Sequence, residues 1–103
     1  MTKLNRSFEN PILVPDSKNK WDSEASFNPS VWQDPSVFRM VYRSVSSKMQ
    51  YLDHEMELST ISYAESPDPI HFTGRRQLFG PEYDWERYGC EDPRVTKFGD
   101  TYY

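Results

Sequence analysis

The spacing of proline and glycine is the feature that most limits what this chain can fold into. Eight prolines and four glycines are spread along 103 residues, and they leave few windows long enough for an uninterrupted helix. Short runs rich in β-branched and aromatic residues lie between them. We therefore predict an all-β fold, built from short strands that polar loops connect.

Several runs have the alternating pattern of a half-buried strand. The predicted strands are Val37–Arg43, Leu58–Ala64, a short Ile70–Phe72 and Arg94–Phe98, followed by a tight turn at Gly99-Asp100 and a fifth strand that starts at Thr101–Tyr103. The alternation divides the first run into two faces, with Phe38, Met40 and Tyr42 on one and Arg39, Val41 and Arg43 on the other.

Two segments are less clear. Met49, Leu52 and Met56 have helical spacing within residues 46–57, which one or two amphipathic turns would explain. A charged loop between two strands explains the segment as well, and we expect the loop. The polar segment 15–20 is expected to be a second surface loop.

Charge and composition narrow the class of protein. Sixteen acidic against twelve basic residues give a net charge of −4, which argues against a nucleic-acid partner. No apolar run approaches the roughly 20 residues that cross a bilayer, and residues 1–6 lack the apolar core of a secretion signal. The single cysteine, Cys90, excludes an internal disulfide and fits a reducing compartment. We expect one small domain of a cytoplasmic protein, without a membrane partner.

The hexapeptide from Gly89 to Arg94 carries the strongest chemical signal. It places the neighbouring carboxylates of Glu91 and Asp92 directly before Pro93. Proline disfavours helical backbone in the preceding residue, so we expect Asp92 to be extended, with Glu91 on the opposite face. One carboxylate would then face a given cleft. A solvated ion pair in an ordinary turn remains the alternative.

Other candidate groups give weaker signals. His54 and His71 are isolated and Cys90 has no ligand spacing, so we expect no metal site. His71 is interpreted as a packing residue between Ile70 and Phe72. The three tryptophans could stack on sugar rings, although packing in the core is the commoner fate; they are Trp21, Trp32 and Trp85.

A series of short motifs resembles the amino-terminal part of glycoside hydrolase family 130, which comprises β-mannoside phosphorylases and related β-mannosidases. The similarity runs from Asn10 onward, and its most specific part is Glu91-Asp92-Pro93-Arg94. The other motifs, in order, are residues 10–13, 25–29, 41–43, 61–68, 70–72 and 99–103, of which the stretch around Asp68 and His71 is shared more loosely with other sugar-active proteins.

The resemblance implies a fold that is larger than this chain. The family forms a five-bladed β-propeller with the active site in its central channel, which takes on the order of 200–250 residues. Residues 1–103 would then be the amino-terminal portion of one domain, comprising the first blade and the opening of the second. An end within a predicted hairpin agrees with a truncated chain.

The resemblance also assigns roles to three residues. Asp92 would be the catalytic acid, whose proton is relayed through a hydroxyl of the bound mannosyl unit. It would have to stay protonated at the working pH, which burial in a channel would favour. Asn28 and Arg43 would hold the mannosyl residue, although Pro29 stands where some members have a small hydroxyl residue. From the residues alone, the alternatives are that Asn28 is a turn residue before Pro29 and Arg43 a solvated charge on a strand. Glu91 is expected to brace the loop by hydrogen bonding.

Three functions stay open. The first is inverting phosphorolysis of β-mannosides to α-mannose 1-phosphate, with inorganic phosphate as co-substrate and no cofactor. The second is a β-1,2-mannosidase on the same scaffold, and the features that separate these two would lie beyond residue 103. The third is a non-catalytic sugar-binding or interaction module. We expect the 103 residues alone to be inactive and the full-length protein to be a possible homo-oligomer.

Overall fold

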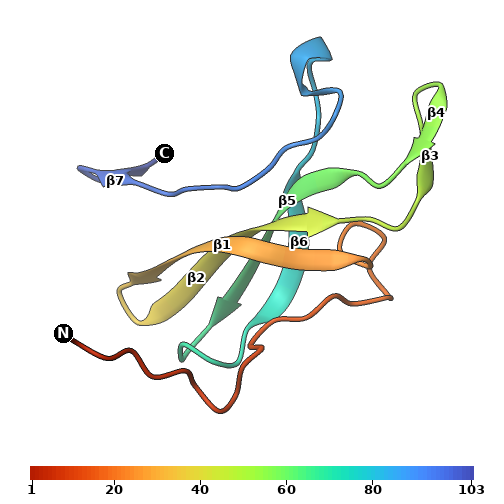
Figure 1. Ribbon diagram of the computed structural model, residues 1–103. Coiled ribbons are helices and arrows are strands. Elements are labelled where there is room, and N and C mark those ends of the chain that lie inside the picture. Colours follow the sequence, from red (N-terminus) through yellow and green to blue (C-terminus); the bar gives the residue numbers. More distant parts are fainter.

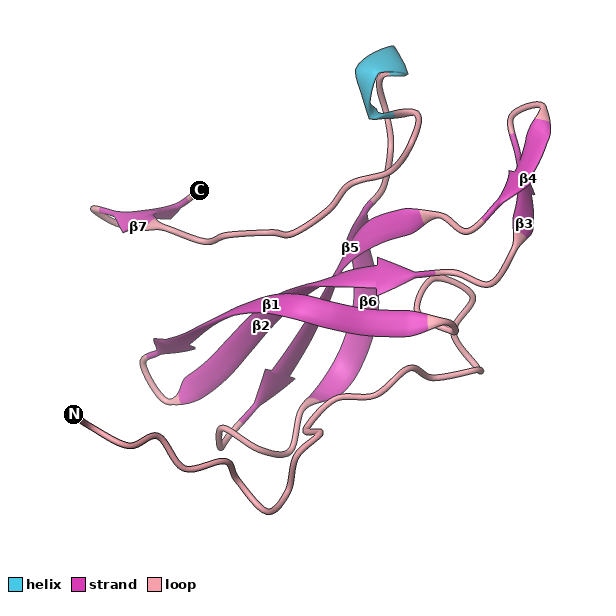
Figure 2. Ribbon diagram, viewed as in Figure 1, coloured by secondary structure: helices cyan, strands magenta, loops and turns pink.

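The computed structural model describes all of residues 1–103, and its centre is one antiparallel sheet of four strands (Figure 1). The strands in spatial order are β1 (Ala25–Asp34), β2 (Val37–Val45), β5 (Ser59–Ser66) and β6 (Thr73–Phe79). Two small hairpins complete the strands, β3 (Met49–Tyr51) with β4 (His54–Met56) and β7 (Lys97–Phe98) with β8 (Thr101–Tyr102). The one helical element is a short 3₁₀ turn, η1 (Asp84–Glu86), so the all-β prediction is confirmed (Figure 2).

Strong alternation identified two of the four sheet strands. The predicted runs 37–43 and 58–64 correspond to β2 and β5, and the division of β2 into two faces is confirmed. The sequence analysis missed β1 as a strand. Its alternation is broken at Asn28-Pro29, where a register shift between Phe27 and Ser30 places a β-bulge in the ladder to β2.

Three predicted segments were wrong in detail. Residues 46–57 form the β3–β4 hairpin, neither a loop nor a helix, and Leu52 occupies its turn with a φ of 55°. The run 70–72 is no strand, because Asp68 accepts hydrogen bonds from the backbone N–H groups of Ile70 and His71 and holds a turn. The edge strand β6 begins just after it. Of the run 94–98, only residues 97–98 form a strand, in the hairpin predicted with the turn at 99–100.

The first face of the sheet packs against the amino-terminal segment, which runs along one side of the sheet (Figure 1). Its core consists of Met40, Tyr42, Ala64 and Phe72, with Ile12, Leu13 and Phe38 packed against them. Hydroxyl groups continue this face toward the hairpin end, where the Ser44 Oγ lies 2.7 Å from the Ser62 Oγ and 3.0 Å from the Thr60 Oγ1. These buried hydroxyl groups are hydrogen-bonded to one another, so their burial does not carry the free-energy cost of unpaired polar groups.

A buried carboxylate fastens the amino-terminal segment to the sheet. Asp22 is completely buried, and its Oδ2 accepts hydrogen bonds from the Tyr42 hydroxyl and the Arg75 Nη1, each at 3.0 Å. The same Arg75 nitrogen donates to the Val14 carbonyl at 2.6 Å. Burial, with the neighbouring carboxylate, raises the pKa of the Tyr42 hydroxyl well above its usual range, so it stays a donor. One ion pair thus joins the loop to β2 and β6.

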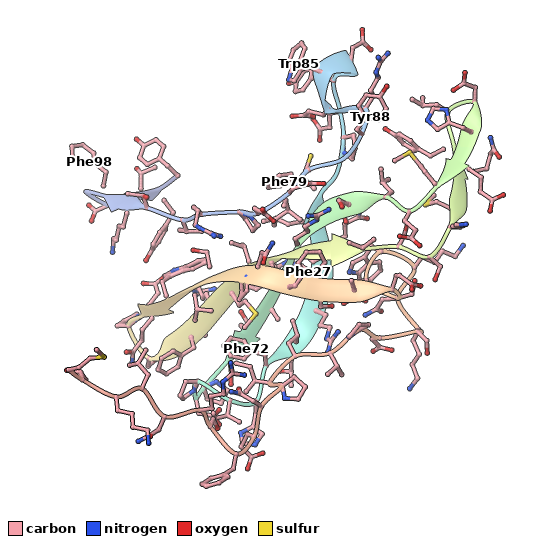
Figure 3. All side chains as sticks on the ribbon, viewed as in Figure 1. Phe27, Phe72, Phe79, Trp85, Tyr88 and Phe98 are labelled. Carbon is pink, nitrogen blue, oxygen red and sulfur yellow. The ribbon has the colours of Figure 1, made fainter.

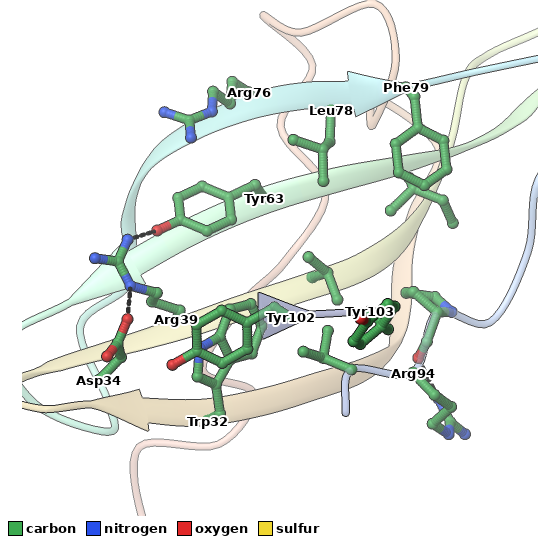
Figure 4. A pocket seen from close by; sticks show the side chains of 14 residues that line it. Trp32, Asp34, Arg39, Tyr63, Arg76, Leu78, Phe79, Arg94, Tyr102 and Tyr103 are labelled. Atoms are coloured by element: carbon green, nitrogen blue, oxygen red, sulfur yellow. Dashed lines mark hydrogen bonds and ion pairs between the residues drawn. The ribbon is translucent and has the colours of Figure 1, made fainter. Parts of the chain in front are cut away.

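The second face is only partly covered, by the segment that leads to β7 and β8. Val41, Ile61 and Tyr63 form its core, with Trp32, Cys90 and Val95 packed against them. A cavity of about 490 Å³ opens on this face and is lined by side chains of the sheet and of residues 93–103 (Figure 4). At its polar end the Arg39 Nη1 donates to the Tyr63 hydroxyl at 2.6 Å and the guanidinium pairs with Asp34.

The structure contains no helix with the length and apolar character needed to span a membrane.

Asp22→Ala should destabilise the protein by about 3–5 kcal/mol, because it leaves the largely buried Arg75 guanidinium without its counter-charge and the Tyr42 hydroxyl without its acceptor. Chemical denaturation followed by far-UV circular dichroism measures the change. Asp53→Ala is the matched control, since Asp53 is 91% exposed and its loss should change stability by less than about 0.5 kcal/mol. Equal effects of the two substitutions would show that the Asp22 ion pair does not fasten the segment.

Candidate functional site

Two residues with unusual backbone conformations meet in space. The non-glycine residues with positive φ are Asn28 (50°), Leu52 (55°) and Asp92 (50°). The Asn28 Nδ2 donates a hydrogen bond of 2.7 Å to the Asp92 Oδ1, although the two residues are 64 positions apart in the chain. Left-handed backbone at non-glycine residues is costly and gathers at functional sites. The pair therefore marks the first candidate position of a site.

The β-bulge in β1 explains how Asn28 reaches its partner. Asn28 and Pro29 lie between the last paired residue on one side, Phe27, and the first on the other, Ser30. A bulge re-aims the side chain of the extra residue, and asparagine is one of the few residues that tolerate this backbone. Asn28 is thus part of a strand, and its amide points to the loop of Asp92.

The expected conformation of Asp92 was wrong. Its φ of 50° is left-handed, whereas a residue before proline favours extended backbone. Glu91 was expected on the opposite face, but both carboxylates approach Arg43. The contacts that outweigh the local preference come from distant strands, through Asn28 and Arg43.

Arg43 holds this cluster together. Its Nε donates to the Ser59 Oγ at 3.0 Å and its Nη2 donates to the Glu91 Oε1 at 2.7 Å, while Nη1 lies 3.8 Å from the Asp92 Oδ1. The guanidinium also lies over the Phe27 ring, 4.8 Å from the centroid. The alternative of a solvated strand charge is therefore wrong, because the Arg43 side chain is 21% exposed and contacts Ser59, Glu91 and Phe27. Glu91 makes the bracing hydrogen bond that we expected.

The loop before the two carboxylates is fastened to the start of β5. The Cys90 N–H donates to the Ser59 carbonyl at 2.9 Å and the Gly89 N–H donates to the Glu86 carbonyl at 2.8 Å. Gly89 has a φ of 115°, and a Cβ at this position would lie 2.9 Å from the Ser59 carbonyl oxygen. Only glycine fits this approach. Burial raises the pKa of the Cys90 thiol, so it stays a neutral packing group.

The cluster leaves polar atoms available to a ligand. The Asp92 side chain is about 50% exposed, and its second oxygen, Oδ2, has no hydrogen-bond partner in the protein. The side-chain oxygen of Asn28, Oδ1, likewise has no hydrogen-bond partner. A carboxyl, an amide and a guanidinium together offer both hydrogen-bond donors and acceptors, which hydroxyl groups of a ligand can use. The arrangement can bind a sugar and can transfer a proton at Asp92.

The histidines lie apart from this cluster. The His71 Nδ1 lies 2.9 Å from the Asp68 Oδ2; this pairing raises the pKa of His71 and, with backbone N–H donors, lowers the pKa of Asp68 to about 2. His71 is exposed, so its interpretation as a packing residue was wrong. No three His, Cys, Asp or Glu side chains gather as they would around a metal ion.

The structure thus brings together Asn28, Arg43 and Asp92, the three residues that the sequence analysis singled out. It also adds two that were missed. Ser59 orients the guanidinium, and Phe27, which Figure 3 shows on β1, forms its stacking surface. Phe27 sits directly before Asn28, and this was the only signal of its role in the sequence. No feature of the sequence around Ser59 indicated its role in orienting the guanidinium.

Known proteins resemble this chain along most or all of its length. The family model of glycoside hydrolase family 130, described as beta-1,4-mannooligosaccharide phosphorylase, matches residues 5–103. A beta-1,2-mannobiose phosphorylase of Thermoanaerobacter sp. (strain X514) is 36% identical over 110 residues, which cover 100% of this chain and 36% of the relative. A 1,2-beta-oligomannan phosphorylase of the same strain is 32% identical, with coverages of 100% and 35%. The chain thus spans about a third of the length of these curated relatives.

Two solved structures are also similar to this chain. One comes from work on glycoside hydrolases of the mannoside phosphorylase family that target β-1,2-mannosidic linkages in Candida mannan. It matches with a TM-score of 0.68 and 28% identity over 87% of this chain and 29% of its own. A glycosyl hydrolase from Bacteroides ovatus matches with a TM-score of 0.68 and 27% identity over the same shares. The family match, the phosphorylase relatives and the shared fold lead to one conclusion: the chain belongs to glycoside hydrolase family 130.

Proposed function

We propose that this chain carries the catalytic acid of an enzyme that cleaves β-mannosides by inverting phosphorolysis. The substrate would be a β-linked manno-oligosaccharide with inorganic phosphate as co-substrate, and the products α-mannose 1-phosphate and a shortened sugar. The relatives at 36% and 32% identity are phosphorylases of β-1,2-mannobiose and of 1,2-β-oligomannan, which supports this substrate class.

One observation carries the proposal, the 2.7 Å hydrogen bond between the Asn28 amide and the Asp92 carboxyl. It fixes Asp92 through Oδ1 and leaves Oδ2 unpaired, where a proton can sit. Arg43 lies beside the same carboxyl and is itself fixed by Glu91 and Ser59. A proton donor between two immobilised sugar-binding groups is the arrangement that general acid catalysis needs.

These groups can account for every bond that breaks and forms in the proposed reaction. Asp92 gives its proton to the leaving glycosidic oxygen, by way of a hydroxyl of the mannosyl unit that Asn28 and Arg43 hold. The C1–O bond breaks as a phosphate oxygen bonds to C1 from the opposite face, so the configuration inverts. Phosphate is already anionic, so this attack needs no second carboxylate as base. Half of the Asp92 side chain is exposed in these 103 residues, so bound substrate and the remaining protein would complete its surroundings.

A hydrolase on the same scaffold is the second candidate. The solved structure matched at 28% identity belongs to work on family members that hydrolyse β-1,2-mannosidic linkages, and this observation favours the alternative. Hydrolysis with inversion needs a base carboxylate on the face opposite the acid. Glu91 does not fit that role, because it lies on the Asp92 side and is paired with Arg43. A non-catalytic module is the weakest candidate, since binding alone does not require a free carboxyl.

We also propose how the chain contributes to a larger fold. A four-stranded antiparallel sheet in the order β1-β2-β5-β6 is the arrangement of a propeller blade, and the β7–β8 hairpin would open the next blade. Residues 1–103 would then be the amino-terminal portion of one propeller domain, inactive alone because other blades complete the channel. The free Cys90 agrees with a cytoplasmic setting, and the full-length protein could form a homo-oligomer.

Asp92→Asn in the complete polypeptide should reduce phosphorolysis of β-mannobiose by about 10²–10⁴-fold. The amide still accepts the hydrogen bond from Asn28, so the fold should be retained, but it has no acidic proton to give. Initial rates of mannose 1-phosphate release measure the loss, and a thermal melt checks the fold. Asp53→Asn in the β3–β4 turn makes the same chemical change on an exposed residue and should leave the rate unchanged. A variant at Asp92 that keeps most of the activity would rule out the assignment of the acid.

A further inference from the structure

We propose that Ser59 is a positioning residue of the reaction, which places the sugar-binding arginine with its side chain and the acid with its backbone. This inference rests on the proposed function, since it deepens the roles that Arg43 and Asp92 have there. Ser59 is the first residue of β5 and is only 5% exposed. Its contacts therefore lie inside these 103 residues and do not depend on which surfaces the rest of the protein covers.

The side chain of Ser59 acts on the arginine. Its Oγ accepts a hydrogen bond of 3.0 Å from the Arg43 Nε, while the Nη2 of the same guanidinium donates to the Glu91 Oε1 at 2.7 Å. Two of the three nitrogens are thereby fixed, one to the sheet and one to the loop. The third, Nη1, lies 3.8 Å from the Asp92 Oδ1 and has no hydrogen bond within the chain. Ser59 thus helps to set the plane in which Nη1 meets a sugar hydroxyl.

The backbone of Ser59 acts on the loop that carries the acid. Its carbonyl accepts a hydrogen bond of 2.9 Å from the Cys90 N–H, two residues before Asp92. The preceding residue, Gly89, approaches so closely that an added Cβ would lie 2.9 Å from the Ser59 carbonyl oxygen and 3.1 Å from the Ser59 Cβ. Two consecutive loop residues therefore rest on Ser59, which fixes the height of the acid above the sheet.

The two contacts use different atoms of one residue, so each can be altered while the other stays. Ser59→Ala removes the hydroxyl that orients Arg43 and keeps the carbonyl that holds the loop. Gly89→Ala keeps the hydroxyl and pushes the loop away from the carbonyl, because the new Cβ needs more room than the structure leaves.

The two alterations should affect different kinetic constants. Arg43 would contact the mannosyl unit before and during bond cleavage, and an interaction made equally in both states lowers KM and leaves kcat unchanged. The acid takes part only in the chemical step. A displacement of the acid by about 1 Å can lower the rate about 10²-fold without weakening substrate binding. The side chain of Ser59 should therefore act mainly on KM and its contact with the loop mainly on kcat.

The test measures kcat and KM of the complete polypeptide for β-1,2-mannobiose at saturating phosphate. Ser59→Ala should raise KM about tenfold, the usual effect of losing a hydrogen bond to a charged group, with kcat changed less than about twofold. Gly89→Ala should lower kcat about 10²-fold, with KM changed less than about threefold.

Two matched controls should leave both constants unchanged. Ser62→Ala removes a hydroxyl from the same strand, completely buried and hydrogen-bonded to the Ser44 Oγ at 2.7 Å, but on the first face of the sheet. Gly74→Ala places a side chain on a glycine that also has a positive φ, 64°, where the nearest atom to the new Cβ is 4.0 Å away. The first control accounts for the loss of a buried hydroxyl, and the second for backbone strain without displacement.

The outcomes are separable. Wild-type constants in Ser59→Ala, or equal changes of kcat and KM in it, would overturn the positioning role while the proposed function stands. So would a wild-type kcat in Gly89→Ala. If Gly89→Ala does not fold, hydrogen exchange of the Cys90 amide decides: it should be as slow in Ser59→Ala as in the wild type, and faster exchange would overturn the separation of the two contacts. Wild-type enzyme that turns over no β-mannoside would refute the proposed function, and this inference with it.

Discussion

The guanidinium of Arg43 is the group on which the arrangement of the site depends. It is bonded to Ser59 on the neighbouring strand and to Glu91 on a loop 48 residues away, and it lies beside Asp92. Two adjacent carboxylates repel each other, and a cation between them removes that repulsion. Without Arg43, the loop would lose its ion pairs and keep the hydrogen bonds that Cys90, Asp92 and Val95 make with Ser59, Asn28 and Ser30. Arg43 is thus the one cation among the contacts that hold the acid next to the sheet.

The sheet makes this possible by giving its two faces different tasks. The first face is closed by the amino-terminal segment and by the buried ion pair of Asp22 with Arg75, which stabilises the strands without involving the site. The second face carries Arg43 and stays open to the loop and to the cavity beside it. Because the strands are fixed from one side, the other side can hold groups whose hydrogen-bonding capacity is not used up. The residues that stabilise the fold are therefore largely different from the residues that form the site.

Local pattern predicted the parts of the structure that local pattern controls. The alternation in residues 37–45 and 59–66 is regular, and both strands and both faces of β2 were predicted correctly. β1 was missed because Pro29 and the bulge break its period. The β3–β4 hairpin was missed because its charged sequence was interpreted as a loop between two strands. At residues 70–72, where a strand was predicted, the hydrogen bonds that Asp68 accepts hold the backbone in a turn. Each error occurred where a side-chain contact or an irregular register overrides periodicity.

The site shows the same limit more sharply. Asn28, Arg43 and Asp92 were singled out through a resemblance between sequences, and the fold brings them together. The left-handed backbone of Asp92 was not predictable, because Pro93 favours the opposite and the deciding partner is 64 residues away. The pairing of both carboxylates with one arginine was hidden for the same reason. A conformation that distant contacts impose leaves no local trace in a sequence.

We propose that Asp92 serves a reaction in which phosphate, and not water, attacks the sugar. The most direct test is to incubate the complete polypeptide with β-1,2-mannobiose, with and without inorganic phosphate, and to identify the products by ³¹P and ¹H NMR. We expect mannose 1-phosphate of the α configuration to form and turnover to stop when phosphate is removed, whereas free mannose should not accumulate. Free mannose released at the same rate without phosphate would contradict it and would identify a hydrolase.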